Sequence, residues 1–206
     1  MKKLYLAILI ILFVVNILQA RNSKEEIFNS LKSKYGNIES VVADFALSTN
    51  QKIKGKFWAK SGNKYIMQMD NRIITCNGTN LWNYSIKQNN VVISSFDKMS
   101  EEVSVEKIMF DLLNEYKVLE AKTELASKGK KQLLILLEKN KKDGNANLNK
   151  VKIWVDANNY SINSIGIDRG GEFEIWNLTN MKINTKIEDS RFEFKTPKNA
   201  EEIDLR

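Results

Sequence analysis

An amphipathic helix is predicted close to the N-terminal end of the chain. Ile27, Leu31 and Tyr35 recur every fourth residue, which places their side chains on one face of an α-helix. Ser23–Glu26 has the form of a capping box, and Gly36 is a typical helix stop. The pattern therefore predicts a helix between these signals, with one apolar face that needs a packing partner.

From Val41 onward apolar residues alternate with polar ones, and this period of two predicts strands with one solvated face. The turn-forming pairs Asn77-Gly78 and Asn89-Asn90 separate successive strands. The large apolar positions of these predicted strands are Phe45, Leu47, Phe57, Trp58, Tyr65, Met67, Met69, Leu81, Trp82, Tyr84, Val91, Val92 and Ile93.

A second helix is predicted over Ser100–Glu115, where one broad apolar stripe faces charged residues. Strands then resume: Leu133–Leu137 is a continuous apolar run, typical of a strand covered on both sides, and strand patterns continue to Phe194. No repeat or linker divides the chain. The elements predict one strongly curved antiparallel sheet with a helix before it and another inserted midway, in a mainly β domain with α elements.

The start of the chain has the form of a secretory signal peptide. Two lysines precede an apolar run over residues 4–18, and the small residue Ala20 stands before the expected cleavage site at Arg21. An uncleaved membrane anchor is the alternative, but about fifteen apolar residues fall short of the ~20 that span a bilayer. We therefore expect residues 1–20 to be removed and residues 21–206 to form a single exported domain.

Composition excludes several chemistries. The 206 residues contain no histidine, which excludes Ser-His-Asp triads, Cys-His pairs and histidine-ligated metal sites. Cys76 is the only cysteine, so no intramolecular disulfide forms, and we expect a buried thiol.

Thirty-two Lys plus Arg against 25 Asp plus Glu give +7, and removing two signal-peptide lysines leaves 30 against 25, or +5. This charge is spread along the chain and predicts solvated surface, with no nucleic-acid partner.

Catalytic signals are weak. Glu172 and Glu174 lie two residues apart, on one face of a strand as a carboxylate pair requires, but a solvated strand face gives the same pattern. We expect no enzyme activity, no cofactor and no metal, and a hydrolase built on these two glutamates is the alternative.

The apolar residues allow two interpretations. They can form a filled core, or they can line an incomplete barrel under a helical cover, which is a common way to enclose an apolar ligand. Export and weak catalytic signals favour binding. The residues concerned are Met67, Met69, Trp82, Tyr84, Val91, Ile93, Ile108, Met109, Leu112 and Leu113.

Four motifs in order along the chain resemble the outer-membrane lipoprotein carrier protein family, LolA. The motifs are Gly55–Lys60, Tyr65–Met69, Asn77–Tyr84 and the closing Phe192–Pro197. Their order and spacing, and the length of the exported chain, agree with the family from about Ser23 to Leu205.

The resemblance implies an incomplete β-barrel closed by a helical lid around an apolar cavity. It implies a monomeric periplasmic carrier that shields lipoprotein acyl chains between an inner-membrane lipoprotein-releasing ABC transporter and the outer membrane, where a receptor accepts them. Each buried methylene contributes about 0.8 kcal/mol, so acyl chains need such shelter in water. A carrier of free lipid or glycolipid with the same fold, or a lipoprotein-sensing regulatory module, is the alternative.

By position, the resemblance assigns partner contact to Tyr65 and the lid to Ile108, Met109, Leu112 and Leu113. We expect the lipid-binding cavity to be lined by Phe57, Met67, Met69, Trp82, Tyr84, Val91, Ile93, Ile153, Ile165, Ile167 and Trp176.

The chain departs from the family at one motif. Lys60-Ser61-Gly62 stands where the family has Lys-Arg-Pro, and that arginine is held to latch the lid in the empty carrier. Ser61 cannot make the same charge-assisted bonds. We therefore expect a weaker or differently arranged latch, with Lys60 or Lys64 as its support.

Overall fold

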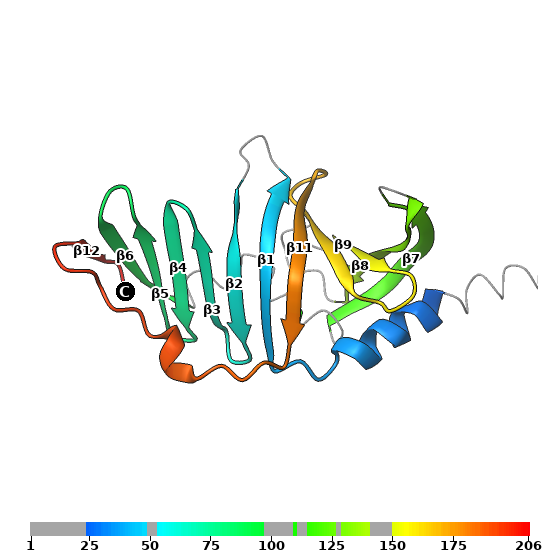
Figure 1. Cartoon of the computed structure of the whole chain (residues 1–206), viewed down its shortest axis with the longest axis horizontal. Coiled ribbons are helices and arrows are strands. Elements are labelled where there is room, and N and C mark those ends of the chain that lie inside the picture. The colour runs from blue at the N-terminus through cyan, green and yellow to red at the C-terminus, as the bar shows by residue number, and fades with distance from the viewer. Residues whose placement is uncertain (1–23, 49–52, 97–108, 111–114, 127–128, 141–149) are drawn as a thin grey trace, which may run out of the picture.

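The computed structural model describes residues 24–48, 53–96, 109–110, 115–126, 129–140 and 150–206. In these residues a helix over residues 24–35 precedes twelve strands (Figure 1). The strands are β1 (Ser40–Ser48), β2 (Lys54–Lys60), β3 (Lys64–Met69), β4 (Arg72–Asn77), β5 (Asn80–Ser85), β6 (Asn90–Ser95), β7 (Tyr116–Leu125), β8 (Lys131–Lys139), β9 (Lys150–Asp156), β10 (Ile162–Asp168), β11 (Phe173–Ile183) and β12 (Glu201–Asp204).

All twelve strands form one sheet, in the order β12-β6-β5-β4-β3-β2-β1-β11-β10-β9-β8-β7. Neighbouring strands are antiparallel except β12, which runs parallel to β6. β7 and β12 are its two edges, so the sheet is not closed into a barrel. The predicted mainly β, mostly antiparallel fold is confirmed. The predicted signal peptide and most of the predicted second helix lie outside the described residues.

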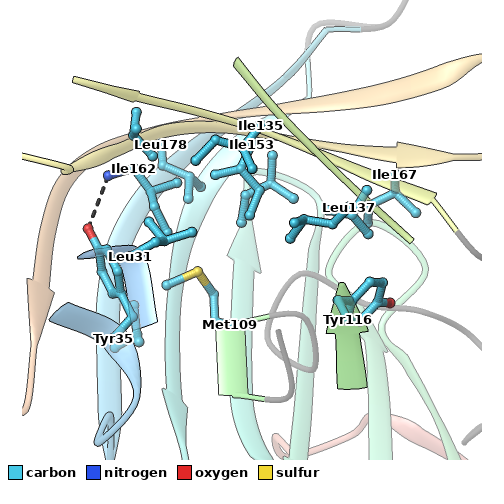
Figure 2. Packing of buried hydrophobic residues seen from close by; sticks show 14 of the residues in the cluster. Leu31, Tyr35, Met109, Tyr116, Ile135, Leu137, Ile153, Ile162, Ile167 and Leu178 are labelled. Carbon is cyan, nitrogen blue, oxygen red and sulfur yellow. Dashed lines mark hydrogen bonds between the residues drawn. The ribbon is translucent and has the colours of Figure 1, made fainter. Parts of the chain in front are cut away.

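The N-terminal helix packs on one face of this sheet, which we call the inner face. Leu31 and Tyr35 of the helix belong to the same buried cluster as Ile153 of β9 and Ile162 of β10 (Figure 2). The helix ends as predicted, where the Gly36 amide donates to the Lys32 carbonyl oxygen at 2.7 Å. The predicted apolar face of the helix therefore finds its partner on the sheet.

The inner face continues from β1 into β2 by close backbone packing at Gly55. Gly55 pairs with Phe45 of β1 and Met69 of β3. A Cβ atom at position 55 would clash with the Gln68 carbonyl oxygen and press on the Phe45 ring. Glycine is required here because the strands and the Phe45 ring leave no space for a side chain.

The opposite face, which we call the outer face, is crossed by the chain after β11. This segment, residues 184–200, passes through the short 3-10 helix η4 (Asp189–Phe192) before β12 joins the sheet edge (Figure 1). Phe192 is fully buried. The centroid of the Phe194 ring lies 6.3 Å from the centroid of the Trp82 ring and 5.9 Å from that of the Tyr84 ring. The segment therefore acts as a strap over the outer face, and we refer to it as the C-terminal strap.

Candidate binding surface

The inner face of β2 and β3 carries half-buried apolar side chains next to the core. Phe57 pairs with Met67, and Met67 pairs with Ile74 of β4, so the three side chains lie side by side on one face. Phe57 is buried in the core, whereas Met67 and Met69 retain exposed surface. The open arm of the sheet therefore extends the apolar core as a surface of flexible methionine side chains, which adapt to irregular shapes.

Tyr65 lies on the same inner face as Met67. It pairs with Ala59 of β2 and Cys76 of β4 and packs, half-buried, against the core cluster. Its place on β3, beside the methionines, is adjacent to the candidate surface. The predicted partner contact at Tyr65 stays a prediction.

Three other predicted lining residues have no exposed surface. Ile153, Ile165 and Ile167 are fully buried in the core cluster with Leu31 and Tyr35 of the helix. Figure 2 shows Ile153 and Ile167 in this cluster. This end of the inner face is filled by the protein's own side chains. Of the two interpretations of the apolar residues, a filled core therefore describes the β9–β10 end.

Trp176 joins the two ends. It is half-buried, and its ring centroid lies 5.1 Å from that of Phe45. Its indole Nε1 donates to Glu174 Oε1 at 2.8 Å, and Arg169 Nη2 lies 3.4 Å from the same oxygen. Glu174 therefore fixes the orientation of the Trp176 indole. Glu174 is one of the two glutamates, with Glu172, that could have formed a catalytic carboxylate pair, and the structure shows it in this structural contact.

Trp82, Tyr84, Val91 and Ile93 lie on the outer face, so they do not share a surface with Met67. Ile74 pairs with Asn83, which puts Asn83 on the inner face and its two neighbours on the outer face. Trp82 in turn pairs with Ile93, and Tyr84 with Val91. The prediction that these four residues line one cavity together with Met67 is thereby corrected. Of these four, Trp82 and Tyr84 contact the C-terminal strap through Phe194.

Met109 is the one lid residue that the structure describes. It is buried in the core cluster, and Figure 2 shows its side chain between Leu31 and Tyr35 on one side and Tyr116 on the other. Ile108, Leu112 and Leu113 lie outside the described residues. The lid and the enclosed cavity therefore stay predictions, while Met109 itself is part of the core.

Lys60 and Lys64 bind the C-terminal strap. Lys60 Nζ lies 2.7 Å from Asp189 Oδ1 and donates to the Ile187 carbonyl oxygen at 3.0 Å, and Lys64 Nζ lies 2.6 Å from Asp189 Oδ2. The hydrogen bonds from both lysines lower the pKa of Asp189 to about 2. The two lysines expected to support a lid latch are thus held by the strap, and Ser61 between them is exposed.

Sequence reasoning missed this strap. Its signal was present as the Phe-x-Phe motif at Phe192 and Phe194, but the motif alone does not say which face the rings cover.

Among the residues that the structure describes, no cluster of acidic, cysteine or histidine side chains has the form of a metal site. In the same part of the chain, no helix is both long and apolar enough to cross a membrane.

The described residues thus form an open, mostly antiparallel sheet with an apolar inner face and one packed helix. Residues 36–195 match the model of the outer membrane lipoprotein carrier protein family, LolA, and the chain belongs to this family. Members of the family are binding and carrier proteins rather than enzymes. No curated protein matches the sequence significantly.

The fold is similar to those of solved structures of low sequence identity. An uncharacterized conserved protein from Thermus thermophilus is 12% identical with a TM-score of 0.55, over 88% of this chain and 99% of that chain. A putative outer membrane lipoprotein-sorting protein domain from Vibrio parahaemolyticus is 15% identical with a TM-score of 0.47, over 81% of this chain and 94% of that one. The lipoprotein LppX of Mycobacterium tuberculosis is 12% identical with a TM-score of 0.47, over 81% and 98%.

Proposed function

We propose that the protein is a periplasmic carrier that shields lipoprotein acyl chains and moves them from the inner to the outer membrane. The observation that carries the proposal is the LolA family match over residues 36–195. The N-terminal signal sequence, residues 1–20, would direct the chain to the periplasm. An inner-membrane lipoprotein-releasing ABC transporter would load the carrier, and an outer-membrane receptor would accept the cargo.

The inner face supplies the chemistry that this role needs. Met67, Met69 and Trp176 keep exposed apolar surface beside a packed core. An acyl chain that lies on this surface removes methylenes from water at about 0.8 kcal/mol each. Flexible methionines can adapt to chains of different shape and release them again, because no directional bond has to break. We place the cargo on the β2–β3 part of the inner face.

The test compares two neighbouring residues of one strand. Met67 and Ile66 lie side by side on β3, are both half-buried, and point to opposite faces of the sheet. We would incubate purified residues 21–206 with spheroplasts of the native host and quantify lipoproteins released as soluble complexes. A charge buried against an acyl chain costs several kcal/mol, so Met67→Glu should reduce release by at least about tenfold.

Ile66→Glu is the matched control, with the same added charge on the outer face. It should leave release unchanged, with thermal unfolding used to show that both variants are folded. Equal release by wild type and Met67→Glu would contradict the inner-face site. Free lipid or glycolipid in the purified protein, without lipoprotein release, would keep the binding face and replace the cargo.

A further inference from the structure

The outer face carries a groove that the proposed carrier role does not use. It has a volume of about 430 Å³, within the range of about 300–1,000 Å³ that ligand pockets occupy. The sheet and the first part of the C-terminal strap form it together. Its lining residues are Val42, Trp58, Lys182, Thr185, Lys186, Ile187, Glu188 and Arg191.

The floor of the groove is apolar. Val42 of β1 pairs with Trp58 of β2 and with Lys182 of β11, so the three side chains lie in a row across the outer face. Ile187 of the strap is buried beside them. A bound group would therefore meet a tryptophan ring and two branched aliphatic side chains, which favours an apolar side chain over a fully hydrated ion.

Cations surround this floor. The Arg191 guanidinium lies 4.5 Å from the centroid of the Trp58 ring, and Lys56 Nζ lies 5.5 Å from the same ring. Among the described residues, neither Arg191 nor Lys182 takes part in an ion pair. An arginine stacked on tryptophan is held in one orientation, with its N–H edge free to bind a carboxylate in bidentate fashion.

The groove also offers acceptors. Glu188 lines it and forms an ion pair with Lys186 at 3.0 Å, and the Thr185 hydroxyl can donate or accept. A carboxylate in the lining repels phosphate and carboxylate groups alike, but Lys186 pairs with this one, and it accepts a hydrogen bond from a peptide N–H, which a lipid phosphate does not offer. Donors, acceptors and an apolar floor together match a polypeptide better than a lipid headgroup.

We propose that this groove docks an acidic peptide segment of a partner protein, with an aliphatic side chain on Val42 beside the Trp58 ring and a carboxylate on Arg191. Lys182 provides the second cation on the opposite side of the floor. The charge of the exported chain, 30 Lys plus Arg against 25 Asp plus Glu, adds attraction toward an acidic partner. The site is independent of the inner face and does not require the carrier role.

The test uses two labelled peptides and fluorescence anisotropy. The first has the sequence Asp-Glu-Leu-Asp-Glu-Leu, and the second replaces each acid by its amide. Wild-type protein should bind the acidic peptide at least about tenfold more tightly than the amide peptide. Raising the salt from 50 to 500 mM should weaken the acidic peptide's binding, because partly exposed charges are screened.

A matched pair of double variants places the site. Lys182→Gln with Arg191→Gln removes two charges from the groove, and Lys195→Gln with Lys198→Gln removes two from exposed strap positions outside its lining. The first pair should raise the dissociation constant at least about tenfold, and the second should leave it nearly unchanged.

Three outcomes would overturn the proposal. Equal affinity for the two peptides would show that the groove does not select carboxylates. Equal loss in the two double variants would show an effect of overall charge. Binding to phosphatidylglycerol vesicles that depends on Arg191, with no binding of the acidic peptide, would assign the groove to a lipid surface instead. Met67→Glu should leave peptide binding intact, which separates this site from the cargo face.

Discussion

The Tyr35 hydroxyl ties the N-terminal helix to the sheet. The ring is buried, and the hydroxyl oxygen accepts a hydrogen bond from the Ile162 amide at 3.0 Å (Figure 2). Tyr35→Phe keeps the ring but leaves that amide without its acceptor. Because an unsatisfied buried donor costs about 1–3 kcal/mol, we expect the free energy of unfolding in urea to fall by this amount.

The same residue gives a test at high pH. Burial raises the pKa of Tyr35 above its ordinary value of 10.0, although the Ile162 hydrogen bond lowers it in part. The folded state therefore disfavours the phenolate, and stability is lost as pH rises above 10. Tyr35→Phe should show less of this loss, and an identical pH profile in the two proteins would contradict the assignment.

Asp189 gives a second pH prediction, with the opposite sign. Hydrogen bonds from Lys60 and Lys64 lower the pKa of Asp189 from 3.8 to about 2. Its contribution to stability is therefore present above pH 3.8 and is lost as pH falls through 2. Asp189→Asn should remove part of the decline in stability in this window, measured by thermal unfolding in low salt. The exposed position predicts a small effect that high salt weakens further.

At single positions the sequence predicts whether a side chain packs against other residues better than it predicts the face of the sheet to which the side chain points. Phe57, Met67 and Trp82 are all large apolar strand residues, and alternation alone identifies them as strand positions facing packed surface. Whether two strands show the same face depends on their register, and a shift by one residue reverses every side chain. β5 carries a large apolar side chain on each face, the buried Leu81 on one and the half-buried Trp82 under Phe194 on the other, so polarity could not separate them.

Among the elements, the C-terminal strap depends on two aromatic side chains. Phe192 is fully buried, whereas Phe194 is half-buried and contacts the Trp82 and Tyr84 rings. Phe192→Ala should lower the free energy of unfolding by about 3–5 kcal/mol, as expected for a large side chain removed from a packed site. Phe194→Ala should cost less, about 0.5–1.5 kcal/mol from its ring contacts. Urea unfolding measures both, and a larger loss for Phe194→Ala would contradict the proposed order.

The regular elements could be predicted and the strap could not. The helix expected between residues 23 and 36 spans residues 24–35, and strands form where the pattern has period two. Residues 184–200 have neither period, since their apolar side chains, such as Ile187, reach the sheet from an irregular backbone. β12 was equally hidden, because three of its four residues, Glu201, Glu202 and Asp204, are charged and all four are exposed.

Across the whole molecule, the strap connects the middle of the sheet to one of its edges. β11 lies beside β1 in the centre, and β12 pairs with β6 at the far end (Figure 1). The outer face is thereby covered over β2–β6, and the inner face of the same strands keeps exposed apolar surface at Met67 and Met69. The two faces of one arm therefore differ in cover, with the strap and its groove on the outside and the proposed cargo surface on the inside.

β12 also protects the sheet edge, which predicts an effect on association. It pairs in parallel with β6 through Ile203 and Val92, and the Leu205 amide donates to the Ile93 carbonyl oxygen. Without it, the backbone groups of β6 form an open edge, and such an edge pairs readily with another strand. Truncation after Asn199 keeps the contact of that residue's carbonyl oxygen with Asn89 and removes β12.

We expect the full-length exported chain to be monomeric and the truncated chain to form dimers in proportion to its concentration. Size-exclusion chromatography with light scattering measures both. Leu205→Ser in the full chain is the control, because it removes an exposed apolar side chain and leaves β12 in place. Dimers in the control would assign association to that side chain. A truncated chain that is folded and monomeric at every concentration would show that β6 resists pairing with another strand by itself and needs no cover.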